Sequence, residues 1–110
     1  MYKLLALDMD GALLNRQKMV TEQVRAEIQK LIDYKIKVTL ASGRFPASLW
    51  LHAKSMGMKF PLIALNGAVI LDPDTGESIH HTVIPQEVAV NIAKYAEKKE
   101  VYVHFYGYNI

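Results

Sequence analysis

Two aspartates, Asp8 and Asp10, stand near the start of the chain, between an apolar run and Gly11. One carboxylate can attack phosphorus or carbon and form a covalent intermediate, while a second protonates the leaving group and later deprotonates water. Paired carboxylates also suit Mg²⁺, which proteins hold through one or two acidic side chains together with a substrate phosphate. An Asp-x-Asp pair standing alone is most often a solvated turn, but the apolar run before it and the glycine after it favour a reactive site.

Two more polar turns offer groups that bind an anion. In the first, the Ser42 hydroxyl can donate to a phosphate oxygen, Gly43 leaves the backbone open, and Arg44 is a surface residue unless an anion binds beside it. The second is Asn66-Gly67, a pair that turns favour for backbone reasons. Each turn alone has a simple structural explanation, so any functional interpretation depends on whether the fold brings the turns together.

The apolar pattern predicts three strands alternating with two helices, which is the order of an α/β, Rossmann-like parallel sheet with helices on both faces. The carboxyl ends of parallel strands meet at one edge of a sheet, so the three polar turns should converge on one crevice. Alternate strand residues point the same way, which would place both aspartates together. The predicted strands are Tyr2–Leu7, Ile36–Ala41 and Pro61–Leu65, and the helices begin after Thr21 and at Pro46.

The pattern changes after the third strand, where a second unit is predicted to begin. Residues 68–71 and 77–83 flank the loop 72–76 and predict a hairpin. A hinge is expected at Ile84-Pro85. The sequence then predicts a helix over Glu87–Lys98 and a strand over Val101–Tyr106.

Composition limits the classes of partner. The chain has 110 residues, 13 Lys and Arg against 11 Asp and Glu, a net charge of +2 and no cysteine. So small a net charge gives no reason to expect nucleic acid as a partner. No apolar run approaches the roughly 20 residues that span a bilayer, so no membrane association is expected. The absence of cysteine is compatible with a reducing compartment, and we expect a cytoplasmic protein.

Three blocks together, Leu7-Asp8-Met9-Asp10-Gly11, Ala41-Ser42-Gly43-Arg44 and Leu65-Asn66-Gly67, closely resemble the haloacid dehalogenase-like superfamily. Their order and spacing are similar to its Cof-type phosphatases, which carry a class IIB cap. The resemblance covers essentially the whole chain. It implies that residues 1–83 are the N-terminal half of an α/β core, which is therefore incomplete, and that residues 84–110 begin an α+β cap.

The resemblance also implies roles. By position, Asp8 would be the nucleophile that becomes an aspartyl phosphate and a ligand of Mg²⁺. Asp10 would be the general acid and then the base, with its backbone carbonyl on the metal. The substrates would be small phosphate monoesters, such as sugar phosphates, nucleotides or cofactors. The expected substrate-binding residues are Ser42, Gly43, Arg44, Asn66 and Gly67.

Two departures from the family pattern bear on activity. Ala12 stands where the family usually has threonine, which removes a hydroxyl near the loop. The family also has a lysine and an acidic metal-binding pair in the second half of its core, and nothing in this chain matches them. Without these groups, the transition state is less well stabilised electrostatically. We therefore expect the 110 residues alone to hydrolyse phosphate esters very slowly or not at all.

Two other functions stay open at this point. The same nucleophile could serve a phosphosugar mutase, and the same scaffold could be a non-catalytic binding domain, which Ala12 favours somewhat. An incomplete sheet also leaves an edge strand exposed, and such an edge invites pairing with another chain. We therefore expect self-association through that edge.

Overall fold

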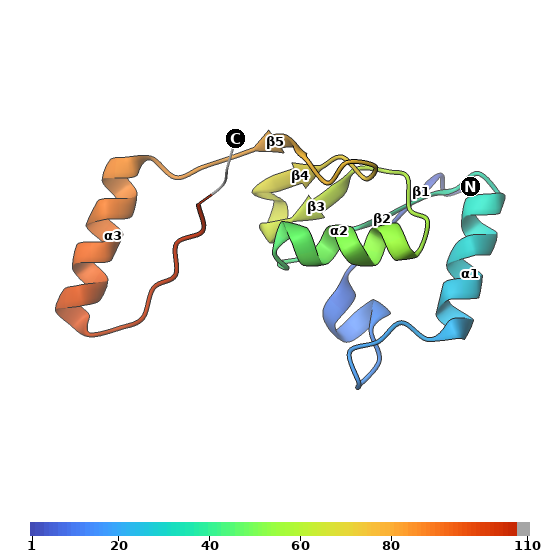
Figure 1. Cartoon of the computed structure of the whole chain (residues 1–110), viewed down its shortest axis with the longest axis horizontal. Helices are drawn as coiled ribbons and strands as arrows, with labels where there is room; N and C mark the ends of the chain where they lie inside the picture. Colours follow the sequence, from blue (N-terminus) through green and yellow to red (C-terminus); the bar gives the residue numbers. More distant parts are fainter. Residues whose placement is uncertain (108–110) are drawn as a thin grey trace.

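A pair of parallel strands forms the centre of the computed structural model, which describes residues 1–107. Strand β1 (Leu4–Leu7) pairs in parallel with β2 (Lys37–Leu40), so that Leu4 lies opposite Lys37 and Leu7 opposite Leu40. Helix α1 (Glu22–Asp33) makes the crossover between them (Figure 1). The predicted strand–helix–strand order is therefore confirmed, with both strands shorter than expected.

Helix α1 begins where the sequence predicts. The Thr21 hydroxyl accepts a hydrogen bond from the Val24 backbone N–H at 3.3 Å, satisfying a donor that the first turn leaves free. The apolar face of the helix turns toward the core, where Ile28 is 3% exposed. The cap thus fixes the start of the helix, and the buried face fixes its rotation.

The third strand links the parallel pair to a meander. Helix α2 (Pro46–Ser55) leads from β2 to β3 (Leu62–Ala64), and one isolated parallel bridge joins Ala41 to Ile63. The predicted parallel direction of β3 is therefore correct. Its regular ladder, however, is antiparallel and is made with the next strand, β4 (Val69–Leu71).

The predicted hairpin is confirmed as β4 paired with β5 (Ser78–His81). Its turn is fastened to α2 by one tryptophan. The Trp50 indole N–H donates to the Pro73 carbonyl at 3.1 Å, and a Cβ placed at Gly76 would lie 2.8 Å from the Trp50 ring. An ion pair between Lys59, in the segment between α2 and β3, and Asp74, 3.2 Å apart, is a second contact of this turn. The hairpin is thus part of the core layer.

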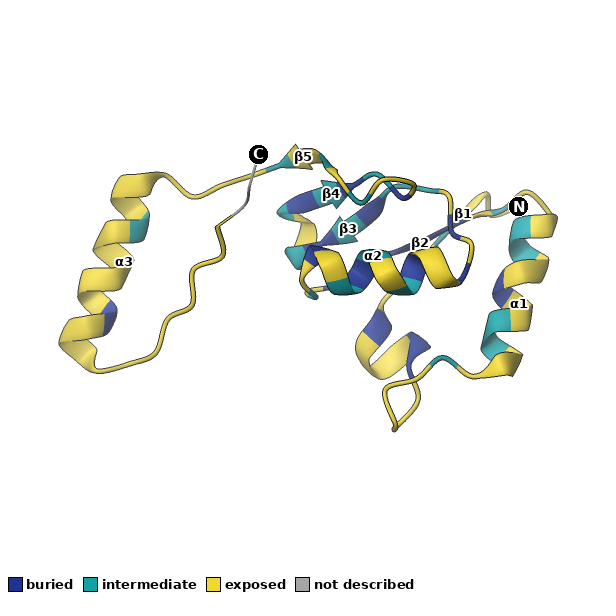
Figure 2. Cartoon of the chain, in the orientation of Figure 1, coloured by how far each residue is buried: buried dark blue, intermediate teal, exposed yellow. Residues whose placement is uncertain are grey.

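Burial concentrates between the strands and the two helices beside them (Figure 2). Leu40 on β2, Leu49 on α2, Leu62 on β3 and Leu71 on β4 are all fully buried. Met9, in the turn that follows β1, is fully buried as well, so each of the three polar turns adjoins a residue of the core. The core therefore holds these turns in fixed positions.

Helix α3 (Gln86–Lys99) lies apart from this core (Figure 1). Ala96 is its one buried residue. The strand predicted over Val101–Tyr106 is wrong, because residues 101–107 have no regular secondary structure. Alternating side chains favour a strand only where another strand completes the ladder, and none of the described residues does so here. The remaining residues of the predicted second unit, 108–110, lie outside the described residues.

Among residues 1–107, no helix has both the length and the apolar character needed to cross a membrane.

Candidate active site

Asp8 stands where β1 ends and the chain turns sharply. The Leu13 N–H donates to the Asp8 backbone carbonyl at 3.2 Å, which closes the turn over Met9–Leu13. The Asp8 carboxylate accepts the Met9 N–H at 2.8 Å. Met9 itself is fully buried and anchors the turn, while the Asp8 side chain stays exposed. The remaining carboxylate oxygen of Asp8 is thus accessible at the edge of the sheet.

The prediction that the pleat of a strand brings the two aspartates together is wrong. Strand β1 stops at Leu7, so Asp8 and Asp10 both belong to the turn that follows. Gly11 adopts a φ of +77°, a left-handed conformation that glycine tolerates best, and this reverses the chain just after Asp10. The turn, and not the alternation of side chains along a strand, sets the relative positions of the two carboxylates.

Arg44 donates two hydrogen bonds to the carboxylate of Asp10. Its Nε lies 2.9 Å from Asp10 Oδ2, and its Nη2 lies 3.0 Å from Oδ1. This bidentate pair, together with Lys18, holds the pKa of the Asp10 carboxyl far below its usual value. Asp10 raises the pKa of Arg44 in turn. The anion beside Arg44 is thus a side chain of the protein itself.

Two further residues lie at this point that could not be predicted from the sequence as part of the site. Lys18 Nζ lies 3.3 Å from Asp10 Oδ1, and the Ser48 hydroxyl accepts a hydrogen bond from Arg44 Nη1 at 3.1 Å. Lys18 reaches the site from a polar loop with no regular period. Ser48 follows Arg44 by four residues, a spacing that brings side chains together only once a helix is known to begin there.

Backbone hydrogen bonds join the second polar turn to the third. Ser42 is buried, its hydroxyl accepts the Arg44 N–H at 3.1 Å, and its carbonyl accepts the Asn66 N–H, also at 3.1 Å. A Cβ at Gly43 would lie 3.0 Å from Asn66 Oδ1, so glycine is what allows the asparagine to sit against this backbone. Gly67 follows with a φ of +96°, and its surroundings are open.

The predicted crevice therefore brings its three segments together. The Ala41 N–H donates to the Leu7 carbonyl at 2.9 Å, which sets Asp8 beside the start of the second turn. Arg44 connects that turn to Asp10, and Ser42 connects it to Asn66. Segments separated by more than thirty residues thus present two carboxylates, a hydroxyl and a guanidinium at one edge of the sheet.

Magnesium would find oxygen ligands at this edge. Carboxylate and carbonyl oxygens are the donors that Mg²⁺ prefers, and it commonly takes only one or two protein carboxylates. Asp8 and Asp10 supply such donors, and they are exposed enough to reach an ion. Within residues 1–107 no group of three or more acidic or histidine side chains is poised for a metal. The donor chemistry thus fits Mg²⁺, but the described residues supply a small ligand set.

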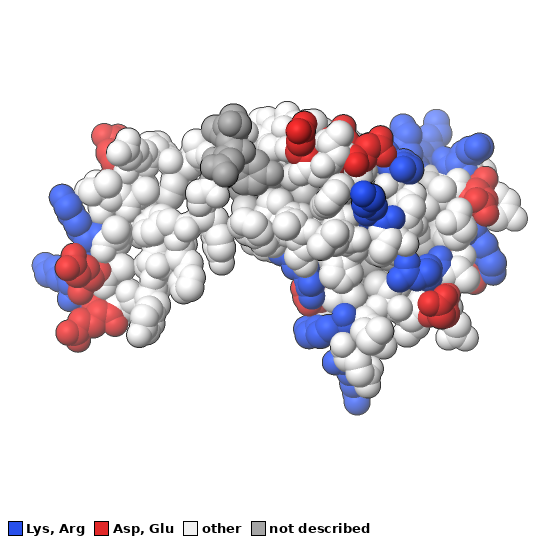
Figure 3. All heavy atoms as spheres, viewed as in Figure 1, with Lys and Arg blue, Asp and Glu red and all other residues white. Residues whose placement is uncertain are grey.

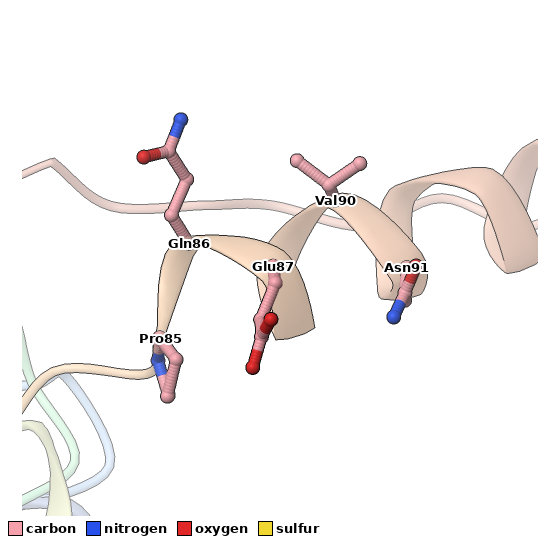
Figure 4. Close-up of a pocket in the computed structure, with 5 residues that line it drawn as sticks. All are labelled: Pro85, Gln86, Glu87, Val90 and Asn91. Carbon is pink, nitrogen blue, oxygen red and sulfur yellow. The ribbon is translucent and has the colours of Figure 1, made fainter.

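One other hollow on the described surface lacks this chemistry. The hollow of 570 Å³ at the start of α3 is lined by one carboxylate, Glu87, and no basic residue (Figure 4). Its remaining lining is Pro85, Gln86, Val90 and Asn91, of which Gln86 and Val90 point away from Glu87 in the same view. Neither a nucleophile with a partner nor an anion-binding group is found there.

The residue pattern of the haloacid dehalogenase-like hydrolases matches residues 5–110. The chain belongs to that family. It is 35% identical over 105 residues to the 5-amino-6-(5-phospho-D-ribitylamino)uracil phosphatase YwtE of Bacillus subtilis, covering 94% of this chain and 35% of that protein. It is 32% identical over 92 residues to the HMP-PP phosphatase of Serratia proteamaculans, covering 84% of this chain and 33% of that protein. The chain thus spans about a third of the length of these relatives.

Solved structures agree with this membership. TM0651 of Thermotoga maritima superposes with a TM-score of 0.74 at 38% identity, over 90% of this chain and 37% of that one. A haloacid dehalogenase-like hydrolase of Bacteroides thetaiotaomicron gives a TM-score of 0.79 at 27% identity, over 91% and 39% of the two chains. The predicted family and fold class are therefore confirmed, as part of a larger fold.

Proposed function

We propose that this chain carries the nucleophile half of a Mg²⁺-dependent phosphatase that acts on small phosphate monoesters. The observation that carries the proposal is the meeting of Asp8, Asp10, Ser42 and Arg44 at the carboxyl edge of β1 and β2. Membership of a hydrolase family and likeness to named phosphatases support it.

The first step is an attack by Asp8. Its free carboxylate oxygen forms a bond to phosphorus, the ester P–O bond breaks, and the leaving oxygen takes a proton from Asp10. Asp8 is then an acyl phosphate. The exposure of its side chain beside the turn leaves room for a substrate to approach.

The second step returns the enzyme to its first state. Asp10 accepts a proton from a water molecule, the water oxygen attacks phosphorus, and the bond to Asp8 breaks to release inorganic phosphate. The Arg44 contact favours the ionised form of Asp10, which is the form that this step needs. The first step needs the protonated form, so we infer that the Arg44 contact loosens when substrate is bound.

The anion would be held by groups already in place. The Ser42 hydroxyl, buried at the base of the second turn, is available to donate to a phosphoryl oxygen, and Gly43 keeps the backbone open beside it. Arg44 and Lys18 add positive charge at the rim. Mg²⁺, held by the Asp8 carboxylate and the Asp10 backbone carbonyl, would neutralise negative charge on the phosphoryl group.

The named relatives support a class of substrate for this chain. Relatives named as phosphatases of a phosphoribitylaminouracil and of HMP-PP support small phosphorylated metabolites as substrates. We propose that residues 1–83 belong to the catalytic core and that residues 84–110 begin a cap. A cytoplasmic location stays a prediction.

Hydrolysis of p-nitrophenyl phosphate with Mg²⁺ tests the proposal. We expect turnover by the 110 residues to be very slow or absent, because the chain spans only about a third of the length of its relatives. Asp8→Asn should abolish that turnover, whereas Asp33→Asn, at the far end of α1, should not. Turnover that survives Asp8→Asn would refute the role of Asp8. Rapid turnover that Asp8→Asn abolishes would refute only the expectation of impaired activity.

A further inference from the structure

A basic hollow lies at the opposite end of the strands from the candidate active site. It has a volume of 260 Å³ and is bounded by the end of α1, the start of β2 and the segment before β3. Ser42 and Asn66 follow the carboxyl ends of β2 and β3, whereas Lys37 and Phe60 lie at or before their amino ends. The hollow is therefore separate from the site proposed for phosphoryl transfer.

All walls of this hollow belong to segments that are neighbours in the described fold. Strand β2 pairs with β1 on one side and reaches β3 through the Ala41–Ile63 bridge on the other. A further strand could therefore join the described sheets only beside β1 or β5. Neither of those strands lines the hollow, so its shape does not come from an open sheet edge.

Lysines surround apolar side chains in this hollow. Among the described residues that line it, three are lysines and none is acidic. Val38 is buried and Phe60 is half-buried, while the lysines, Lys35, Lys37 and Lys59, are exposed. Figure 3 shows Lys and Arg side chains gathered near the N-terminus, at the end of the molecule that holds α1. Apolar walls with a few charged groups are typical of a site for a small organic ligand.

Two of the three lysines have no acidic partner. Lys59 Nζ lies 3.2 Å from Asp74 Oδ1, which offsets its charge. Within residues 1–107, Lys35 Nζ takes part in no hydrogen bond or ion pair. Lys37 Nζ lies 5.4 Å from the centre of the Phe60 ring, which attracts the ammonium group and helps to hold it at the hollow. Two positive charges are thus left for a ligand.

The end of helix α1 does not require a lysine at position 35. The Leu31 carbonyl accepts the Ile36 N–H at 3.0 Å, and the Ile32 carbonyl accepts the Lys35 N–H at 2.9 Å, so the backbone satisfies both carbonyls. Lys35 adopts a φ of +65°, a left-handed conformation that glycine adopts at lower cost. The backbone at this position therefore favours glycine, and the lysine side chain is available to a ligand.

We propose that this hollow binds a small organic anion, with an apolar body against Val38 and Phe60 and a carboxylate or phosphate head group at Lys35 and Lys37. Burial of the body and attraction to two cations favour such a ligand over a neutral molecule or a bare inorganic anion. The volume of 260 Å³ lies below the roughly 300–1,000 Å³ of pockets for drug-sized ligands, so the ligand is small. This inference goes beyond the proposed function and does not depend on catalysis.

An NMR titration of the isotope-labelled 110-residue chain with 2-naphthoate tests the proposal. Saturable shifts are expected at the backbone amides of Ile36 and Val38, which line the hollow. A second titration with naphthalene-2-phosphonate distinguishes the head groups, because the tighter ligand carries the one that the lysines prefer. Neutral 2-naphthalenemethanol and inorganic sulfate should both bind roughly tenfold more weakly than the tighter anion, since each lacks one of the two features.

Lys35→Gly removes one cation and also relieves the backbone. It should weaken binding roughly tenfold, as expected for the loss of one hydrogen bond to a charged group. Its Tm should stay the same or rise, because glycine adopts a φ of +65° more readily than lysine. Weaker binding in this variant is therefore distinct from unfolding. Lys37→Gln should weaken binding to a similar degree, with an unchanged circular dichroism spectrum.

Two substitutions in the arm are matched controls. Lys98→Gln removes the same charge on α3, which lies apart from the core (Figure 1). Glu100→Gly replaces another left-handed residue at a helix end, with a φ of +54°. Neither control should weaken binding, because neither residue lines the hollow.

Four results would overturn the proposal. They are the absence of saturable shifts at Ile36 and Val38, equal binding of the neutral analogue, undiminished binding in both lysine variants, and equal weakening by Lys98→Gln. Shifts confined to Ser42 and Asn66 would also overturn it, because they would place the probe in the candidate active site.

Discussion

At the scale of single residues, the contact between Arg44 and Asp10 determines how the site can work. A carboxylate held by two guanidinium hydrogen bonds, at 2.9 and 3.0 Å, is ionised and fixed in direction. Such a group is ready to accept a proton and poorly suited to donate one. Exposure of 43% for the Asp10 side chain means that a bound phosphate could compete for Arg44.

Gly43→Ala is predicted to displace the Asn66 side chain. The new methyl group would lie 3.0 Å from Asn66 Oδ1, closer than ordinary contact. The side chain is exposed and can turn away, so the loss of stability should be small while the site is rearranged. The Asn66 side-chain amide resonances should shift in an NMR spectrum, with little change in Tm.

Gly107→Ala is the control for this substitution, because, among the described residues other than its chain neighbours, no atom lies within 4 Å of the position where its Cβ would be. Its Asn66 resonances should match those of the wild-type chain. Unchanged Asn66 resonances in Gly43→Ala would contradict the close approach of the second and third turns.

Residue types could be predicted better than residue contacts. The sequence predicted the carboxylate pair, the serine turn and the asparagine turn, because each follows an apolar run. It could not predict that Arg44 would bind Asp10, since an arginine beside a turn has many anions within reach. The Lys18 contact was equally hidden, because the loop that carries it has no regular period.

At the scale of elements, the contact between the β4–β5 turn and Trp50 of α2 holds the β3–β4–β5 sheet on the core. Gly76→Ala is predicted to lower the free energy of unfolding for two reasons. Alanine at a φ of +76° costs roughly 1–2 kcal/mol. Its methyl group would also lie 2.8 Å from the Trp50 ring. Urea unfolding should show that the free energy of unfolding falls by more than this backbone cost.

Gly67→Ala separates the two causes, because its φ of +96° is also strained, but no atom of the described residues other than its chain neighbours lies within 4 Å of where its Cβ would be. Its stability should fall by the backbone cost alone. Equal losses for the two variants would show that the contact between the turn and Trp50 contributes nothing.

The same turn should make stability depend on acid. Asp72 Oδ1 accepts the N–H groups of Thr75 and Asp74, and these bonds hold the pKa of Asp72 below its ordinary value of 3.8. A lowered folded-state pKa means that the carboxylate stabilises the fold above 3.8 and that this contribution disappears as the pH falls through the folded-state pKa.

Asp72→Asn keeps an acceptor oxygen in the turn but removes the titration. The difference in free energy of unfolding between the wild-type chain and this variant should therefore be largest near neutral pH and shrink below about pH 4. A series of urea unfolding curves at different pH values measures it. A difference that is constant with pH would contradict the stabilising role of the ionised turn.

The start of a helix could be predicted from the sequence where one or two neighbouring residues determine it. Thr21 as a cap and Pro46 at the first turn of α2 each fix a helix start by a local rule. The strand predicted at residues 101–106 did not form, because a ladder needs a partner that no local pattern can supply. The turn after β1 was expected at Gly11, but its shape could not be predicted, since it depends on burying Met9.

At the scale of the whole molecule, the chain is a compact core with an extended arm. Its radius of gyration is 16.7 Å. A compact domain of about this length has a radius of gyration near 13 Å. The difference comes from α3 and the segment after it, which touch the core sparingly. One such contact is the pair of rings of Phe45 and Tyr106, with centroids 5.4 Å apart.

A chain ending at residue 83 is therefore predicted to keep the thermal stability of the core. The segment it lacks includes α3, where Ala96 is the one buried residue, so little apolar burial is lost. Differential scanning calorimetry should give a Tm close to that of the full chain. A chain ending at residue 71 should be far less stable, because it loses β5 and the turn that Trp50 holds. A large fall in Tm for the chain that ends at residue 83 would contradict the division into a stable core and a separate arm.

The central claim is that Asp8 accepts a phosphoryl group. Beryllium fluoride mimics that group on an aspartate, so fluorine NMR of the chain with beryllium fluoride and Mg²⁺ tests the claim without any need for turnover. We predict a bound fluoride resonance that requires Mg²⁺, is lost in Asp8→Asn and persists in Asp33→Asn. A bound signal that survives Asp8→Asn, or no bound signal in the folded wild-type chain, would contradict the account and favour a non-catalytic binding domain.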